Sequence, residues 1–274
     1  MSMYRIVRHL LPLALAMLLP LAAVAGSGKS LPAIAIIIDD LGDKLNQGKR
    51  ALALPGKVTL SFLPHTQHAK QLANKAHLSG KEVMLHLPME TETGKHLGPG
   101  GLTLHMTESE IKTVTNKAIH SIPHVKGVNN HMGSLLTRHP GAMDWFLRVV
   151  KERGALYFVD SRTSVHTVAR KIAQENEIPS TSRDLFLDHV QSRKAIRNKF
   201  QRLLKLAKKQ GFAIGIGHPY PETLALLKKE LPSLASKGVR LVPVSEIIKL
   251  QQAGDPGQEP SNTRMVAKRL QGER

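Results

Sequence analysis

The stretch that decides the fold is Ile34-Ala35-Ile36-Ile37-Ile38-Asp39-Asp40, in which five apolar residues are followed directly by two carboxylates. A short apolar run bounded by polar residues is typical of a strand that is buried on both faces. Side chains alternate between faces within a regular strand, but both carboxylates can lean into one site where the chain turns into Leu41. Two abutting carboxylates require a metal ion, a cation or a shared proton. The alternative is an aspartate that only caps the following helix.

Strand-like and helix-like segments alternate along the rest of the chain. Strands are expected at residues 33–39, 58–63, 82–87, 125–129, 156–160, 180–187, 213–217 and 239–242. Helices are expected at residues 44–53, 67–79, 108–120, 143–153, 164–175, 192–210 and 221–231. This alternation predicts an α/β fold, a distorted or incomplete parallel β/α barrel of about seven strands. A flat doubly wound sheet is the alternative, which the absence of a dinucleotide fingerprint and of a phosphate loop disfavours.

Residues 1–25 have the pattern of a secretory signal peptide. Arg5 and Arg8 precede an uncharged run over residues 10–23, and Ala-Val-Ala at residues 23–25 matches the small-x-small cleavage pattern. The run, at about 14 residues, is short for a spanning helix, which needs about 20. We therefore predict export to the periplasm, with no integral membrane domain after cleavage. An uncleaved membrane anchor is the alternative.

The remaining chain is expected to form one domain without internal repeats. From residue 251 the sequence is rich in Gln, Gly, Pro and charged residues without apolar periodicity, which is typical of a disordered tail. The expected organisation is a signal peptide (1–25), a short linker (26–32), one domain (33–250) and a disordered polar tail (251–274).

Composition narrows the class of partner. The chain has a formal net charge of +18 and no cysteine, so its core must be stable without disulfides. The positive charge favours anionic neighbours such as cell-wall polymers or lipid headgroups. Export and the aromatic content of 4% argue against nucleic acid, because few side chains are present on which bases could stack. The basic helix expected over residues 192–210 either faces an anionic polymer or is a solvated outer helix.

Polar residues recur at the ends of the expected strands. In a parallel β/α fold these ends lie on one face, so residues far apart in sequence converge there. This joint pattern indicates an active site. Its members are Asp39, Asp40, His86, Asn129, Asn130, His131, Asp160, Arg162 and His218.

Imidazoles combined with a carboxylate suit a divalent metal ion, with zinc favoured, and an open fourth position suits catalysis. Asp40, His86 and His131 form the best triad because they end the first, third and fourth strands. Glu90 is either an additional ligand or an acceptor for donors of the long loop over residues 88–106.

The chain resembles the divergent polysaccharide deacetylase family, distant relatives of the chitooligosaccharide and peptidoglycan deacetylases. The resemblance covers roughly residues 33–250, and its most specific parts are Asn-Asn-His-Met-Gly-Ser (129–134) and His-Leu-Pro-Met (86–89). The other matching stretches are Ile-Ile-Ile-Asp-Asp-Leu-Gly (36–42), Phe-Val-Asp-Ser (158–161) and Ala-Ile-Gly-Ile-Gly-His-Pro (213–219).

The resemblance implies an incomplete β/α barrel with a divalent metal at its mouth. In the better-known deacetylases the first aspartate of the pair is the general base and the second binds the metal, which carries over to Asp39 and Asp40. Their metal motif has two histidines four residues apart, whereas here His86 is followed by Glu90. Their Arg-x-Pro-x-Gly motif is also missing, and residues 129–133 stand in its place. We infer that His131 supplies the lost imidazole.

The expected catalytic groups are Asp39, His218 and Asp160. Asp39 removes a proton from the attacking water, and His218, as an imidazolium, protonates the leaving group. Asp160 is expected to orient either His218 or Arg162, the alternative being a buried pair with Arg162.

Asn129, Asn130 and Arg162 are the expected substrate and oxyanion contacts. For the two asparagines the alternative is turn formation through side chain–backbone hydrogen bonds. The predicted function is that of an exported metal-dependent hydrolase that removes acyl groups from a carbohydrate or cell-wall glycan. The alternative is a non-catalytic envelope protein that binds or organises glycans and keeps a vestigial metal site.

Overall fold

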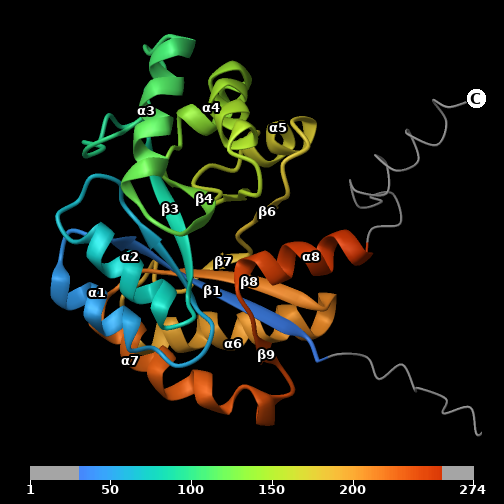
Figure 1. Cartoon of the computed structure of the whole chain (residues 1–274). Helices are drawn as coiled ribbons and strands as arrows, with labels where there is room; N and C mark the ends of the chain where they lie inside the picture. Colours follow the sequence, from blue (N-terminus) through green and yellow to red (C-terminus); the bar gives the residue numbers. More distant parts are fainter. Residues whose placement is uncertain (1–30, 255–274) are drawn as a thin grey trace, which may run out of the picture. The chain divides into compact units, whose positions relative to one another are not determined.

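The computed structural model describes residues 31–254 (Figure 1). The expected signal peptide, most of the expected linker and most of the expected tail lie outside the described residues. The strands are β1 (Ala33–Leu41), β2 (Thr59–Phe62), β3 (Glu82–Met89), β4 (Val125–Met132), β5 (Tyr157–Asp160), β6 (Ser180–Ser182), β7 (Leu185–Phe186), β8 (Phe212–Gly217) and β9 (Arg240–Leu241). The helices are α1 (Leu45–Leu52), α2 (Ala69–Leu78), α3 (Glu108–Ser121), α4 (Pro140–Glu152), α5 (Ala169–Glu175), α6 (Arg193–Gln210), α7 (Pro221–Glu230) and α8 (Val244–Gly254).

The strands form one sheet in which neighbouring strands pair in parallel. The spatial order is β6-β5-β4-β3-β2-β1-β8-β7, and β9 pairs with β1. The expected α/β fold, an incompletely closed parallel barrel, is confirmed. The described residues form nine strands rather than about seven: the eight expected segments are all present, and the one over residues 180–187 forms two strands.

The sheet curls because its two ends belong to one extended segment. β6 pairs with β5 at one end and β7 pairs with β8 at the other, yet only two residues separate them in sequence. The amide of Arg183 donates to the carbonyl of Asp160, and the amide of Asp184 donates to the carbonyl of Ile214. The N···O distance is 3.0 Å in each bond. The segment therefore passes directly from one end of the sheet to the other.

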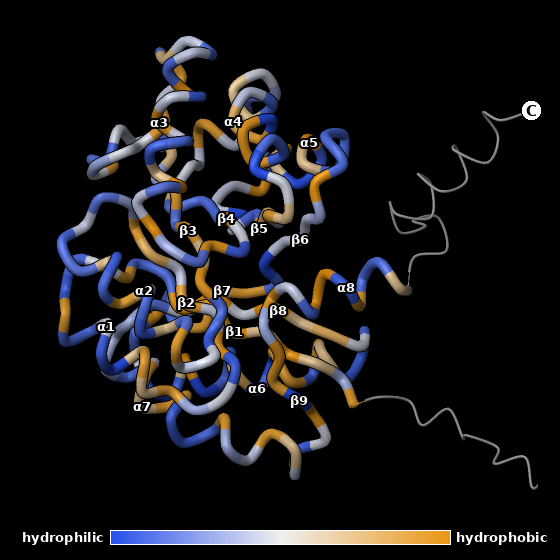
Figure 2. The backbone as a smooth tube through the Cα atoms, viewed as in Figure 1, coloured by the Kyte–Doolittle hydropathy of each residue, from blue (hydrophilic) through white to orange (hydrophobic). Residues whose placement is uncertain are grey.

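β1 is buried on both faces, which explains its unbroken apolar run. Ile34, Ile36 and Ile38 belong to the larger core cluster, between the sheet and the outer helices. Ala33, Ala35 and Ile37 point the other way, into a second cluster that includes residues of α8. Figure 2 shows hydrophobic residues along the central strands, while hydrophilic residues recur in the helices and loops around them. A strand without a solvated face has no need for polar alternation.

α8 is an element that the sequence analysis missed, and the expected tail begins too early because residues 251–254 are helical. Val244, Ile247 and Ile248 are buried in the second core cluster. Their spacing is that of one helix face. The helix packs against β1 and β8 on the face opposite α6 (Figure 1). The described residues thus form two core clusters, one on each face of the sheet. None of their helices combines the length and the apolar character needed to cross a bilayer.

Gly127 marks a close approach between neighbouring strands. A Cβ atom at this position would overlap the ring of Tyr157, its partner in β5. That ring is buried and its hydroxyl donates to Glu82 over 2.7 Å, so it has little freedom to move.

We expect Gly127→Ala to lower the free energy of unfolding by about 1–3 kcal/mol, the usual effect of overpacking a core. Equilibrium denaturation with urea measures the change. Gly141→Ala is the matched control, because Gly141 lies in α4 with no atom within 4 Å of an added Cβ. The control is expected to be neutral or slightly stabilising. Equal stability of the two variants would contradict the packing argument.

Candidate metal centre

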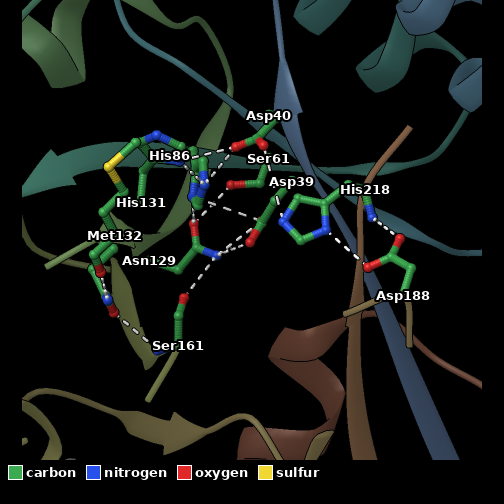
Figure 3. A network of polar contacts seen from close by, with 11 residues as sticks. Asp39, Asp40, Ser61, His86, Asn129, His131, Met132, Ser161, Asp188 and His218 are labelled. Atoms are coloured by element: carbon green, nitrogen blue, oxygen red, sulfur yellow. Dashed lines mark hydrogen bonds and ion pairs between the residues drawn. The ribbon is translucent and has the colours of Figure 1, made fainter. Parts of the chain in front are cut away.

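The carboxyl ends of the strands bring most of the expected site residues together, as Figure 3 shows. β1 contributes both carboxylates, Asp39 and Asp40, because its regular pairing with β2 breaks between Ile38 and Leu41. Asp40 has a φ of 57°, in the left-handed region that residues other than glycine rarely adopt. This local turn of the backbone lets two consecutive side chains face one site, as the sequence analysis expected.

Three of these side chains form a compact ligand cluster. Asp40 Oδ1 lies 3.2 Å from His86 Nε2 and 2.9 Å from His131 Nδ1. The two imidazole nitrogens are 3.0 Å apart. This is the only such cluster among the residues that the structure describes, and it is the triad expected from the sequence.

The chemistry of this triad fits a divalent ion. Asp40 Oδ1 is buried, and although two imidazole nitrogens lie near it, neither meets it in hydrogen-bond geometry. The three atoms thus converge on a common point. Ligands around a tetrahedral zinc ion with bonds of about 2.0–2.1 Å are separated by roughly 3.3 Å. The observed separations are close to that value, so the residues present are suited to hold such an ion.

Asn129 orients the ligand His86. Its Oδ1 accepts hydrogen bonds from His86 Nδ1 over 2.8 Å and from the Ser61 hydroxyl over 2.7 Å. A proton on Nδ1 leaves the lone pair of Nε2 free to face the metal position. The Nδ2 group of Asn129 donates to both oxygens of Asp39, at 2.9 and 3.2 Å. Asn129 is fully buried and its amide donors are engaged with Asp39, so the structure shows it as a residue that holds Asp39 and His86, and its role towards an oxyanion stays a prediction.

The two aspartates of β1 have opposite electrostatic environments. Burial raises the pKa of Asp39, against the opposing effects of His86, His218 and Asn129. Burial also acts to raise the pKa of Asp40, but the attraction of the nearby imidazoles of His131 and His86 outweighs it and holds that pKa well below its usual range. Adjacent carboxylates with separated pKa values are suited to different roles, a base and a ligand.

His218 faces the site from the opposite side, at the end of β8. Its Nδ1 donates to Asp188 Oδ1 over 2.9 Å, and its Nε2 lies 3.9 Å from Asp40 Oδ2 (Figure 3). Asp188 is also held by the backbone amide of His218 and by the hydroxyl of Thr223. Burial acts to lower the pKa of His218, but the hydrogen bond and the negative charge of Asp188 raise it to about 9.

Asp188 is a site residue that the sequence analysis missed. It follows β7 at the position where the other strands carry their polar groups, so the rule applied elsewhere would have found it. The expectation that Asp160 orients His218 is wrong. Asp160 accepts the backbone amide of Arg162 over 2.8 Å and the Thr167 hydroxyl over 3.0 Å. Burial raises its pKa, against these bonds. No ion pair between Asp160 and the exposed Arg162 side chain occurs in the described residues, so the expected pair is not borne out; the contacts of Asp160 instead hold the chain after β5.

Asn130, Arg162 and Glu90 lie outside the ligand cluster. Asn130 donates to the carbonyl of Met132 over 2.7 Å and accepts the amide of Ser161 over 2.8 Å, which confirms the turn-forming alternative. Arg162 is exposed, and its carbonyl accepts a bond from Arg183. Glu90 accepts the backbone amide of Leu104 over 2.6 Å, so it binds the long loop as the second expectation proposed.

A pocket of about 200 Å³ opens beside the ligand His131. The loop over residues 96–99 forms one wall, and Leu63 and Pro64 after β2 form another. Asp43 and Thr66 add polar groups to its lining. A pocket lined by both polar and apolar groups next to a metal position is suited to a small part of a substrate.

A parallel, incompletely closed α/β barrel whose strand ends carry an Asp-His-His ligand cluster and a second Asp-His pair defines a deacetylase-like fold with a candidate metal centre. The chain belongs to the divergent polysaccharide deacetylase family, which it matches over residues 36–248. An uncharacterised protein of Escherichia coli K12, YibQ, is 36% identical over 250 residues, covering 91% of this chain and 76% of that protein.

Two further proteins are similar to this chain. An uncharacterised protein of Haemophilus influenzae Rd is 33% identical over 201 residues, covering 73% of this chain and 71% of that protein. The crystal structure of the uncharacterised protein ATU2773 from Agrobacterium tumefaciens C58 superposes with a TM-score of 0.77 at 25% identity, covering 81% of this chain and 91% of that one.

We expect the purified protein to bind one divalent ion per chain at the triad, with zinc favoured. Elemental analysis after dialysis should find less than about a tenth of this content in a His86→Ala, His131→Ala double variant, because a single carboxylate holds zinc poorly. The control is His139→Ala, which removes an exposed imidazole at the start of α4. Chelation should lower the unfolding temperature of the wild type and leave that of the double variant unchanged. Equal metal content in both would refute the ligand assignment.

We expect Asp188→Asn to lower the pKa of His218. Without the carboxylate the imidazolium loses its anionic partner, while burial continues to disfavour the charged form. In the wild type the ring stays protonated up to a pH of about 9, and in the variant it loses its proton at a lower pH. NMR titration of the imidazole measures the change in the metal-free protein. An unchanged midpoint would show that Asp188 does not control His218.

Proposed function

We propose that the protein is an exported, metal-dependent hydrolase that removes acyl groups from a carbohydrate of the cell envelope. One observation carries the proposal: the triad Asp40, His86 and His131, the buried Asp39 and the Asp188-held His218 all face one point at the barrel mouth. A metal with a purely structural role would require only the triad. Membership of a polysaccharide deacetylase family supports a glycan as the substrate.

Asp39 is the proposed general base. Bound at the triad, a divalent ion would supply Lewis acidity and would lower the pKa of a water ligand. Asp39 is adjacent to the ligand Asp40, and Asn129 fixes its carboxylate in one orientation. Burial raises its pKa towards the range in which a carboxylate is an effective proton acceptor near neutral pH.

His218 is the proposed general acid. Because Asp188 raises its pKa to about 9, the imidazole carries a proton at neutral pH. Nδ1 is engaged with Asp188, which leaves Nε2 facing the site to deliver a proton to the leaving group. The ring of Phe186 stacks against the imidazole at 5.9 Å between centroids and helps to hold its plane. Asp188 acts through His218 and is therefore a positioning residue.

The pocket beside His131 is the proposed position for the part of the substrate next to the acyl group. At about 200 Å³ it is much larger than an acetyl group, and the carboxylate of Asp43 and the hydroxyl of Thr66 are partners for sugar hydroxyls. The loop over residues 96–99 closes one side of this pocket, so its sequence contributes to substrate selection.

Release of acetate from N-acetylated and O-acetylated glycan oligomers by the metal-loaded protein tests the proposal. We expect Asp39→Asn and His218→Gln each to lower kcat by about 10²- to 10⁴-fold, the usual contribution of a positioned acid or base. Metal content should be retained in both variants, which separates a lost proton transfer from a lost ion. His139→Ala is expected to keep full activity.

A binding role without catalysis is the second candidate, favoured by the burial of Asp39. Its exposed fraction is 1%, and both of its oxygens already accept hydrogen bonds from Asn129. Such a carboxylate could serve only to orient His86. Bound metal and glycan affinity without turnover, both unchanged in Asp39→Asn, would support this role and would sink the hydrolase proposal.

A further inference from the structure

α6 presents an unusual concentration of positive charge. Its 18 residues include eight cations and no acidic residue. Seven of the eight are exposed, and Lys199 is half-buried. The cations are Arg193, Lys194, Arg197, Lys199, Arg202, Lys205, Lys208 and Lys209.

Half of these cations form a stripe on the outer side of the helix. The inner side is buried in the larger core cluster through Ile196, Phe200, Leu203, Leu204 and Ala207. Because a helix turns by about 100° per residue, four cations lie within a narrow arc opposite that buried face. This basic stripe consists of Lys194, Arg202, Lys205 and Lys209, and it is about 22 Å long at 1.5 Å per residue.

The basic stripe has no carboxylate partner among the residues that the structure describes. Some basic residues of α3, α4 and α5 form ion pairs with acidic neighbours: Lys112 with Glu152, Arg148 with Asp144, Lys151 with Glu177 and Lys171 with Glu175. α1 and α2 also contain no acidic residue, but each carries only two Lys or Arg residues, whereas α6 carries eight. Repulsion between like charges along one helix costs stability, and an anionic partner would relieve it.

Neighbouring segments extend the positive surface at the end of α6. α7 packs beside α6 (Figure 1) and ends with the exposed Lys228 and Lys229. The first described residues also lie at this end of α6. The amide of Ala33 donates to the carbonyl of Gly211, which directly follows α6, at an N···O distance of 2.9 Å. Thirty residues precede Leu31, and the apolar run over residues 10–23 ends eight positions before it.

We infer that the basic stripe of α6 docks the domain on a lipid bilayer that carries anionic phospholipid headgroups. A cation close to such a surface gains about 1 kcal/mol, so several acting together give stable but salt-sensitive binding. The stripe lies along the outer side of a single helix, which suits a flat surface, whereas single-stranded anionic polymers are commonly held in grooves.

Docking through this stripe leaves the metal centre open. The ligands lie at the carboxyl ends of β1, β3 and β4, whereas the stripe lies on the outer side of a helix that covers the sheet. The inference does not depend on the proposed hydrolase activity. A protein without turnover would dock equally well.

Co-sedimentation with vesicles tests the inference, with the chain that begins at Gly26 so that the apolar N-terminal run does not contribute. We expect binding to phosphatidylcholine vesicles that contain roughly 30% phosphatidylglycerol, and no binding to pure phosphatidylcholine. The stripe variant is Lys194→Glu, Arg202→Glu, Lys205→Glu, Lys209→Glu. Each cation contributes about fivefold to partitioning, so this variant should lose at least about a hundredfold.

The matched control changes the net charge by the same amount on α1 and α2. It is Lys49→Glu, Arg50→Glu, Lys70→Glu, Lys75→Glu, all at exposed positions. We expect this control to retain most of the binding. Urea denaturation verifies that both variants are folded, and a version with glutamine at the four stripe positions replaces the stripe variant if it is not.

Three results would overturn the inference. Equal losses in the stripe and control variants would mean that only net charge matters. Equal binding to neutral and anionic vesicles would exclude headgroup charge as the cause. Preferential binding of the stripe to a soluble polyanion such as polyphosphate, with no vesicle binding at about 0.15 M salt, would assign it to a polymer instead.

Discussion

Side chains from β1, β3 and β4 bring three lone-pair atoms close together at the mouth of the barrel. The other groups of the site are arranged around these three atoms. Asp40 Oδ1, His86 Nε2 and His131 Nδ1 are separated by 2.9–3.2 Å, and the buried oxygen has no hydrogen-bond partner. Such an arrangement is favourable only with a cation or protons among the three atoms. The neighbouring groups are consistent with this demand, since Asn129 binds the far side of His86 and leaves Nε2 directed inwards.

The acid–base half of the site depends on the pairing of β7 with β8. Asp188 follows β7 and His218 follows β8, so the parallel pairing of these two strands places the carboxylate beside the imidazole. The metal triad is built on other strands, β1, β3 and β4. The two halves of the site therefore rest on different parts of one sheet.

Local backbone strain at the strand ends is supported by the core beneath them. Asp40, Met132 and Arg162 each follow a site strand or end one, and each has a positive φ between 49° and 57°. Such conformations cost of order 1–3 kcal/mol each in non-glycine residues. β1 can sustain this cost because both of its faces are buried, in two separate core clusters. Rigid strands thus hold ligands in positions that a free loop would not maintain.

The amino-acid sequence alone determined the βα order, the burial of β1 and the convergence of Asp40, His86 and His131, because strand periodicity and the parallel rule place strand ends on one edge. It left open which polar groups contact one another. Asn129 holds Asp39, Asp188 rather than Asp160 holds His218, and α8 fills the inner face of the sheet. Those pairings depend on side-chain direction and on the curling of the sheet around residues 180–187. Both are set by packing between segments far apart in sequence, which no local pattern specifies.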